Sequence, residues 1–157
     1  MPDAFVPGQQ MKVDVRVAPG AEDLPLPEYK TAGSVGMDLY AAVQEPVTIA
    51  PGKRAVVPTG VHIAVPEGYE AQVRARSGAA RDFGIGLVNA PGTIDSDFRG
   101  LLQVILINTG EEPYTIRRGD RIAQLVVAPV VRVVWNIVDS LDQTARGEGG
   151  FGHTGRH

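Results

Sequence analysis

Between residues 85 and 107 the chain reads Ile85-Gly-Leu-Val-Asn-Ala-Pro-Gly-Thr-Ile-Asp-Ser-Asp-Phe-Arg-Gly-Leu-Leu-Gln-Val-Ile-Leu-Ile107, and this stretch decides the fold. Two apolar runs, 85–88 and 101–107, flank a centre rich in turn-forming residues. Apolar runs separated by Gly, Pro, Asn and Asp are typical of the two strands of a β-hairpin. The centre also carries the carboxylates of Asp95 and Asp97 beside an aromatic ring and an arginine. We therefore predict a hairpin whose tip holds a fixed carboxylate next to an aromatic-walled slot, an arrangement suited to a catalytic loop.

Short β-type runs continue on both sides of this hairpin. From residue 11 to 17, apolar residues alternate with charged ones, which is the pattern of a half-buried strand. Only residues 77–83 favour a short helix, for which Ser77 is a suitable N-cap. The sequence therefore predicts an all-β fold, a jelly-roll-like distorted β-barrel with one short helix. The remaining β-type runs are 47–49, 55–57, 61–65, 71–74, 114–116, 121–127 and 130–138.

Length and composition indicate one ordinary globular domain. The chain has 157 residues, of which 43% are hydrophobic and 21% charged, and this size suits a single domain. Its net charge of -3 argues against nucleic acid as a partner, and no apolar run is long enough to cross a membrane. The absence of cysteine excludes disulfides, zinc–thiolate sites and thiol nucleophiles. Because residues 1–10 lack the features of a secretion signal, we expect a cytoplasmic protein.

The two ends of the chain differ from its middle. Residues 1–10 are predicted to be a loose extension, 11–138 a β-barrel domain and 139–157 a flexible C-terminal arm. The arm ends in Arg146-Gly-Glu-Gly-Gly-Phe-Gly-His-Thr-Gly-Arg-His157, where the glycines make a packed element unfavourable. Two interpretations stay open: a disordered end, or an arm that closes over a ligand with Phe151 as its apolar contact.

The apolar runs 122–127 and 130–134 leave a similar choice. Both are rich in β-branched residues, and strands that are apolar on both faces are usually covered on both sides. Because a domain of this size has a limited interior, the extra apolar face indicates either an ordinary two-layer core or a subunit interface.

Three further segments carry polar side chains that suit phosphate chemistry. At Arg74-Ala-Arg-Ser-Gly78 a strand ends before a helical turn, which is either a phosphate cradle or a surface arginine beside a serine N-cap. In the extended segment 33–41, three interpretations of Asp38 stay open: it is an exposed residue, it pairs with Arg76, or it holds water on a metal ion. Gln124 is either a satisfied amide or a donor to a phosphate oxygen. The chain contains neither a P-loop nor a dinucleotide-binding glycine motif at a strand–helix junction.

Five motifs follow one another in a fixed order along the chain. They are Asp-Leu-x-Ala from Asp38, Arg-Ser-Gly from Arg76, Gly-Thr-Ile-Asp-Ser-Asp-Phe from Gly92, Gly-Asp-Arg-Ile-Ala-Gln from Gly119 and Arg-Gly-x-Gly-Gly-Phe-Gly from Arg146. Together they resemble the signature of the trimeric deoxyuridine triphosphatase (dUTP pyrophosphatase, dUTPase) family. The resemblance implies a homotrimer of jelly-roll subunits that exchange C-terminal arms and build each active site from all three chains. It also implies a Mg²⁺-dependent hydrolase that converts dUTP to dUMP and pyrophosphate, which limits uracil in DNA and supplies dUMP for thymidylate synthesis.

The resemblance also implies a role for each motif residue. Asp95 is expected to deprotonate the water that attacks the α-phosphorus and to meet the sugar 3′-hydroxyl, while Asp97 is interpreted as a turn or packing residue. Phe98 is expected to pack under deoxyribose and exclude a 2′-hydroxyl, and Asp38 to bind waters of a Mg²⁺ held by the triphosphate. The residues expected at uracil are Asn89, Gly92, Thr93, Ile94, Gln103 and, on the arm, Phe151 with Gly152. The residues expected at the phosphates are Arg76, Ser77, Gly78, Gln124 and Arg146.

Two positions depart from the family's usual pattern. Phe98 stands where tyrosine is common, so the steric exclusion of ribose remains but any contact of a phenol hydroxyl is lost. Ala75 replaces a proline often found before the Arg-Ser-Gly triplet, which leaves that turn less rigid. Two alternative functions stay open: a related dCTP deaminase of the same fold, and a non-enzymatic jelly-roll binding module.

Overall fold

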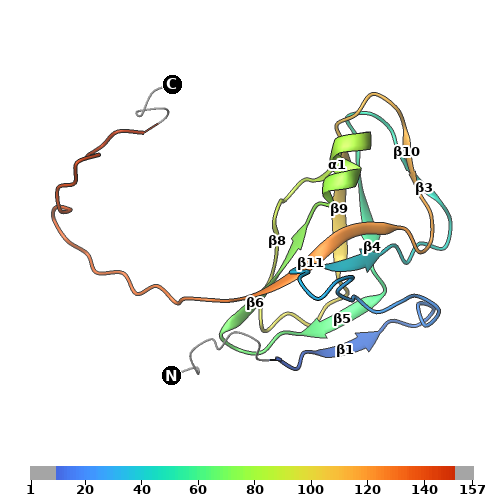
Figure 1. Cartoon of the computed structure of the whole chain (residues 1–157), viewed down its shortest axis with the longest axis horizontal. Helices are drawn as coiled ribbons and strands as arrows, with labels where there is room; N and C mark the ends of the chain where they lie inside the picture. The colour runs from blue at the N-terminus through green and yellow to red at the C-terminus, as the bar shows by residue number, and fades with distance from the viewer. Residues whose placement is uncertain (1–9, 151–157) are drawn as a thin grey trace.

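The chain folds into a barrel-like β body from which a long C-terminal segment extends on one side (Figure 1). The structure is a computed structural model that describes residues 10–150, so the predicted loose extension lies almost wholly outside it. The all-β prediction with one short helix is confirmed. Within the described residues the elements are β1 (Asp14–Val17), β2 (Met37–Tyr40), β3 (Val47–Ile49), β4 (Arg54–Pro58), β5 (Val61–Ala64), β6 (Tyr69–Arg74), α1 (Ser77–Phe83), β7 (Ile85–Leu87), β8 (Gly92–Ile94), β9 (Gln103–Asn108), β10 (Tyr114–Ile116) and β11 (Arg121–Pro129).

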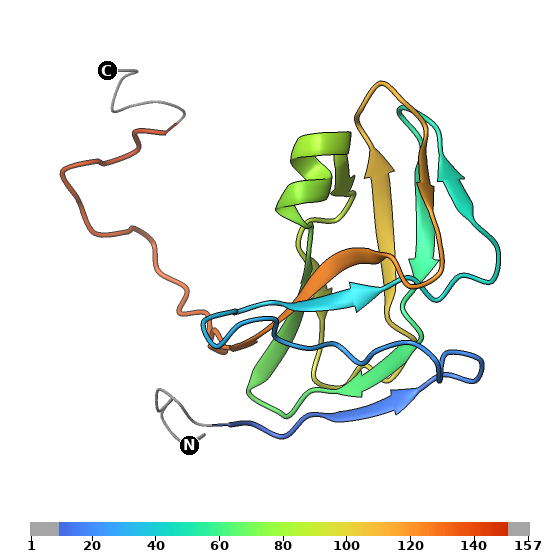
Figure 2. The same cartoon turned by 45° about the vertical axis from the view of Figure 1, so that its right-hand side comes forward.

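The strands pair antiparallel in four sheets. The larger two have the strand orders β2-β11-β6-β8 and β4-β9-β7, and the smaller two are the pairs β1-β5 and β10-β3. β11 lies between β2 and β6, both far from it in the sequence. Such long-range antiparallel pairing is expected of a jelly-roll. In Figure 2 the orange β11 runs across the body, in a different direction from the upright golden β9.

The core lies between these sheets. All four sheets contribute apolar side chains to one cluster, which includes Leu39 of β2, Ile49 of β3, Ile63 of β5 and Leu106 of β9. Leu39 and Leu106 are almost completely buried. Burying such a side chain stabilises the fold by about 1.5–3 kcal/mol, so the cluster holds the sheets in a fixed relative position.

The predicted hairpin is present, but its tip belongs to another sheet. β7 and β9 pair antiparallel, with Ile85 opposite Asn108. Between them the chain leaves this sheet, and β8 pairs with β6, with Gly92 opposite Val73. The loop that carries the candidate carboxylate therefore spans two sheets and is anchored at both ends.

The helix α1 forms where the sequence predicts it, but its cap differs. The N-cap is Arg76, whose side chain makes no capping hydrogen bond, so the prediction of Ser77 as N-cap is wrong. The reason is that the chain stays extended through Arg76, with φ -82° and ψ 127°, which makes Ser77 the first helical residue. Gly84 ends the helix with a left-handed φ of 68°. Over residues 10–150, no helix combines the length and apolar character needed to cross a membrane.

The segment after β11 is not a strand, so the strand prediction for residues 130–138 is wrong for the single chain. The N–H of Val130 donates to the carbonyl of Gly68 at 2.8 Å, and the chain then leaves the body (Figure 1). Val134, Trp135 and Ile137 are 92%, 87% and 96% exposed. A strand requires a neighbour to pair with, and within one chain this apolar segment meets none among the described residues.

Candidate active site

Asp95 lies at the start of a tight turn that directly follows β8. The N–H of Phe98 donates to the carbonyl oxygen of Asp95 at 3.1 Å, which places Ser96 and Asp97 at the centre of the turn. Asp97 thus occupies a turn position, as its sequence interpretation states. Asp95 is exposed, which a carboxylate that must reach a substrate requires.

The Phe98 ring packs directly over Gly100. A Cβ atom on Gly100 would lie 2.5 Å from Cζ and 2.8 Å from Cε2 of this ring, closer than real Cβ contacts allow. Only glycine at this position therefore lets the ring fold back onto its own loop. The side chain remains 40% exposed, which leaves part of the ring free for a ligand. Sequence reasoning missed Gly100, for which the Phe-x-Gly spacing is the one available signal.

The residues expected to read a pyrimidine lie together next to this turn. β8 is an edge strand of its sheet, so one of its backbone edges is free of the ladder. The amide Nδ2 of Asn89 lies 3.4 Å from the position of a Cβ on Gly92, so the two are neighbours. The N–H of Val88 donates to the carbonyl of Ile105 at 3.0 Å, which extends the β7–β9 pairing and brings Gln103 alongside this segment. The structure therefore gathers Asn89, the β8 backbone with Thr93 and Ile94, and Gln103.

A cavity of about 410 Å³ with a mixed polar and apolar lining opens beside the turn. Four of its lining residues come from the loop, and the others from the start of β6 and the segment at the end of β11: Thr93, Asp95, Ser96, Asp97, Gly68, Tyr69, Glu70, Val130 and Arg132. Its volume is within the range of small-molecule sites. The predicted base thus faces a space that can take part of a ligand.

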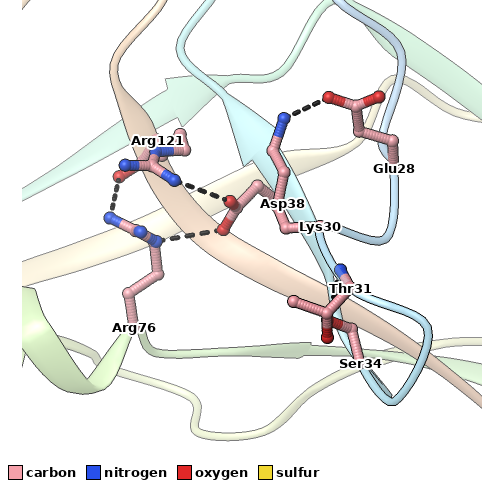
Figure 3. A network of polar contacts seen from close by, with 7 residues as sticks. All are labelled: Glu28, Lys30, Thr31, Ser34, Asp38, Arg76 and Arg121. Carbon is pink, nitrogen blue, oxygen red and sulfur yellow. Dashed lines mark hydrogen bonds and ion pairs between the residues drawn. The ribbon is translucent and has the colours of Figure 1, made fainter.

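A second group of polar residues surrounds Asp38, which is only 4% exposed. The Nε of Arg76 donates to its Oδ1 at 3.0 Å, which is one of the alternatives that the sequence left open, and Nη1 of Arg121 donates to its Oδ2 at 3.3 Å (Figure 3). The Nη1 of Arg76 also donates to the carbonyl of Arg121 at 3.4 Å. Two guanidinium groups share one carboxylate, so the cluster keeps a positive charge that suits an anion.

Sequence reasoning missed Arg121, and a β-bulge explains why. In a regular strand, residues three apart point to opposite faces, so Arg121 and Gln124 would not lie near the same group. The pairing of β11 with β2 shifts register between Arg121 and Ala123. Arg121 thereby contacts the carboxylate of Asp38, while Gln124 lies directly opposite Asp38 in the ladder.

The remaining residues predicted at the phosphates adjoin this cluster. Gln124 pairs across the sheet with Arg74 as well as with Asp38, and it is half-buried. Ser77 and Gly78 begin α1, whose first N–H groups have no partners within the helix. A Cβ on Gly78 would meet nothing within 4 Å, so this position borders open space. These residues form a polar surface that can bind phosphate oxygens.

The two groups lie at opposite ends of β6. Ile94 is opposite Ala71, so Asp95 lies level with Glu70. Arg76 follows the other end of β6, six residues along the chain (from 70 to 76). At about 3.3 Å per residue of extended chain, the two backbone positions are roughly 20 Å apart. One chain therefore does not bring its carboxylate and its own arginine onto the same phosphorus.

The predicted residues of the arm lie apart from both groups. Arg146 is in a turn of the exposed C-terminal segment, where its Nε donates to the carbonyl of Gly149 at 2.7 Å. None of the hydrogen bonds of residues 131–150 reaches the β body. Phe151 and Gly152 lie outside the described residues.

Asp38 is the one carboxylate of this cluster, and it suits a magnesium ion only if water and substrate phosphate supply the other ligands. Among residues 10–150, no group of three or more His, Cys, Asp or Glu side chains could hold a metal by itself. The Asp38 carboxylate accepts two arginine hydrogen bonds and has about four acceptor positions, so about two remain for water. Magnesium keeps several waters and commonly combines them with one or two carboxylates and substrate phosphates, which matches this arrangement.

Known proteins are similar to this chain over most of its length. The dUTPase family model matches residues 22–155. A deoxyuridine 5′-triphosphate nucleotidohydrolase of Anaplasma marginale (strain St. Maries) is 55% identical over 145 residues, which cover 92% of this chain and 99% of that protein. A protein of the same name from Ehrlichia canis (strain Jake) is 58% identical over 137 residues, 86% of this chain and 90% of that protein.

Solved structures show the same architecture. The Staphylococcus bacteriophage 80alpha dUTPase with dUPNHPP is similar to this chain with a TM-score of 0.82 and 26% identity, and the match covers 93% of this chain and 99% of that one. The family model spans most of the sequence, and the two relatives match over nearly their whole length. The chain belongs to the dUTPase family.

Proposed function

We propose that this chain hydrolyses dUTP to dUMP and pyrophosphate. The observation that carries the proposal is the exposed Asp95 at the loop tip, between the free edge of β8 and the Phe98 ring. The loop therefore places three parts next to one another: a base, a strand edge that can hydrogen-bond a pyrimidine, and an aromatic ring that can pack against the sugar. The names of the two relatives state this substrate for those proteins, and the bacteriophage enzyme binds an analogue of it.

Uracil is read by backbone and amide groups. The free edge of β8 offers N–H donors and carbonyl acceptors in a fixed alternation, which can match the alternating oxygens and N–H of uracil. Cytosine carries a donor where uracil has an acceptor, and the methyl group of thymine needs additional room. The amides of Asn89 and Gln103 add contacts beside this edge, and Phe98 packs under the sugar where a 2′-hydroxyl would clash.

Asp95 is the general base. It accepts a proton from a water molecule as the water oxygen forms a bond to the α-phosphorus. The bond between that phosphorus and the bridging oxygen breaks, and pyrophosphate leaves with the electron pair. Proton transfer to a positioned carboxylate contributes about 10²–10⁴-fold to the rate, and holding the water in line with the leaving group contributes further.

The cluster around Asp38 holds the phosphates. Arg76 and the first N–H groups of α1, at Ser77 and Gly78, bind phosphate oxygens, and Gln124 donates a further hydrogen bond. Arg146 on the arm meets the terminal phosphate. Asp38 would accept hydrogen bonds from the waters of a Mg²⁺ bound by the triphosphate. The ion would neutralise phosphate charge and so favour attack by water.

The active site is shared among the chains of a homotrimer. The roughly 20 Å between Asp95 and Arg76 along β6 supports a site in which one chain supplies the base and another the phosphate cluster. The exposed apolar segment with Val134, Trp135 and Ile137 supports exchange of C-terminal arms, because a neighbouring chain would cover it. The arm of a third chain then brings Phe151 over the uracil ring, with Gly152 beside it.

In the cell, this activity limits the incorporation of uracil into DNA and supplies dUMP for thymidylate synthesis. We place it in the cytoplasm, with dUTP and further copies of the same chain as its partners.

A nucleotide panel tests the proposed function. Pyrophosphate release is measured from dUTP, dCTP, dTTP and UTP, each with and without Mg²⁺. We expect release from dUTP to exceed that from each other nucleotide at least about a hundredfold in kcat/KM, since a site built to hydrogen-bond one base strongly rejects the others. Equal rates with all four would contradict the proposal. Ammonia release from dCTP would support the deaminase instead, and no turnover of any nucleotide would support a binding module.

A further inference from the structure

The loop from Asp95 to Leu102 is held by side chains that have no role in the chemistry proposed above. The Nη1 of Arg99 donates to the carbonyl oxygens of Ser96 at 2.7 Å and of Phe98 at 2.8 Å. One guanidinium nitrogen thus joins a carbonyl at the centre of the turn to the carbonyl of the residue that closes the turn. Because a charged donor makes stronger hydrogen bonds than a neutral one, this contact fixes both peptide planes.

The same loop is tied to β5 by His62. The ring Nδ1 of His62 lies 3.0 Å from the carbonyl oxygen of Arg99, and since a carbonyl can only accept, Nδ1 carries the proton and donates. The next anchor is Leu102, whose N–H donates to the carbonyl of Val61 at 2.9 Å and whose carbonyl accepts from the Thr59 hydroxyl at 2.8 Å. Four carbonyl groups between the turn and β9, those of Ser96, Phe98, Arg99 and Leu102, therefore accept hydrogen bonds from side chains.

These tethers contribute more to geometry than to stability. Arg99 is exposed and His62 only half-buried, and hydrogen bonds at such positions contribute little to the free energy of unfolding. Their carbonyl partners, however, belong to Ser96, which directly follows the base, to Phe98 itself and to the residue after it. A displacement of about 1 Å at a catalytic group can lower the rate by about a hundredfold.

We propose that Arg99 and His62 are positioning residues that together fix the direction of the Asp95 carboxylate and the Phe98 ring. This inference rests on the proposed function, because it gives these two side chains, together called the brace, a role in that reaction. The brace acts on two properties at once. The direction of the carboxylate determines kcat, and the place of the ring determines the selectivity for dUTP over UTP.

The test compares four variants with the wild-type enzyme: Arg99→Ala, His62→Leu, His62→Asn and the control Arg54→Ala. Arg54 is an exposed arginine on β4 for which the described structure shows no side-chain hydrogen bond. We expect Arg99→Ala to lower kcat by about 10- to 100-fold and to reduce the dUTP-to-UTP selectivity. Its urea unfolding midpoint is expected to equal that of Arg54→Ala. His62→Leu changes kcat in the same direction, and His62→Asn restores it because the asparagine amide also presents an N–H at the δ position.

Hydrogen exchange of the Phe98 amide gives a readout that does not depend on turnover. This amide donates within the turn, so its exchange is expected to become faster in Arg99→Ala than in the control. The brace is disproved if Arg99→Ala keeps the wild-type kcat, selectivity and exchange rate, or if it loses kcat only together with a lowered urea midpoint. Absence of dUTP turnover in the wild-type enzyme would instead refute the proposed function and, with it, the assignment of the brace to catalysis.

Discussion

Replacing Asp95 with asparagine is expected to lower kcat for dUTP by about a thousandfold, because the amide keeps the shape of the carboxylate but cannot accept the proton of the attacking water. Affinity for a non-hydrolysable dUTP analogue is expected to change by less than about threefold, since the β8 edge, the Phe98 ring and the phosphate cluster are untouched. Single-turnover kinetics measure the chemical step, and calorimetric titration with the analogue measures binding.

Asp97→Asn is the matched control for this variant. It makes the same chemical change two residues away, at an exposed position in the centre of the turn. We expect its kcat to stay within about threefold of wild type, because a turn residue has no part in proton transfer. If Asp97→Asn were inactive and Asp95→Asn active, the base would be Asp97.

Ending the chain after Ala145 is expected to give the second largest effect. The deletion removes the stacking of Phe151 on uracil, about 1–3 kcal/mol, and the contact of Arg146 with phosphate, about 1.5–3 kcal/mol. At 1.4 kcal/mol per tenfold, kcat/KM should fall by about 10²–10⁴-fold. Folding should be unaffected, because the described contacts of Arg146 and Gly149 are with each other. This is checked by comparing the truncated with the full-length protein, which should have equal urea midpoints and the same oligomeric state by light scattering.

Mixing the truncated chain with the Asp95→Asn chain tests whether the site is shared. We expect each variant alone to be nearly inactive, whereas a mixed form of the proposed homotrimer can combine an intact loop from a truncated chain with an intact arm from a full-length chain. For random assembly at equal amounts, the loop is intact in half of the sites and the arm is intact in half of the sites. Both are therefore intact in about a quarter of the sites, which recover activity. Coexpression of the two chains provides the mixed trimers. A mixture as inactive as its components would show that loop and arm belong to one chain.

Much of the fold follows from local patterns in the sequence. Alternation of apolar and polar residues located β1, and apolar runs located β9 and β11. This works because the side chains on a buried face of a strand are apolar. The segment 130–138 shows the limit of this reasoning. Its composition is that of a strand, but a strand also needs a partner, and within the described single chain no partner adjoins it.

The motifs point to most of the candidate site residues, but they do not show every contact between them. Asp38 pairs with Arg76, which is one of the alternatives that the sequence left open for this carboxylate. Arg121 was missed because a bulge turned it toward Asp38, and a bulge leaves no clear sequence signal. Gly100 was missed because its role depends on a contact with a ring two residues away that only the folded loop creates.

The resemblance implies a site built from several chains, but the distance between Asp95 and Arg76 within one chain lies beyond sequence reasoning. Asp95 and Arg76 are both motif residues, and their order in the chain does not show how far apart they lie. The distance follows from the register of β8 on β6, in which Ile94 is opposite Ala71. Register depends on packing between distant segments, so it became visible only in the folded chain.

The central claim is that Asp95 directs water to the α-phosphorus of dUTP, and the position of oxygen transfer tests it most directly. The enzyme hydrolyses dUTP with Mg²⁺ in water enriched in a heavy oxygen isotope, and mass spectrometry locates the label in the two products. Attack at the α-phosphorus predicts one heavy oxygen in dUMP and none in pyrophosphate. Label in pyrophosphate with none in dUMP would show attack at the β-phosphorus and would contradict the account.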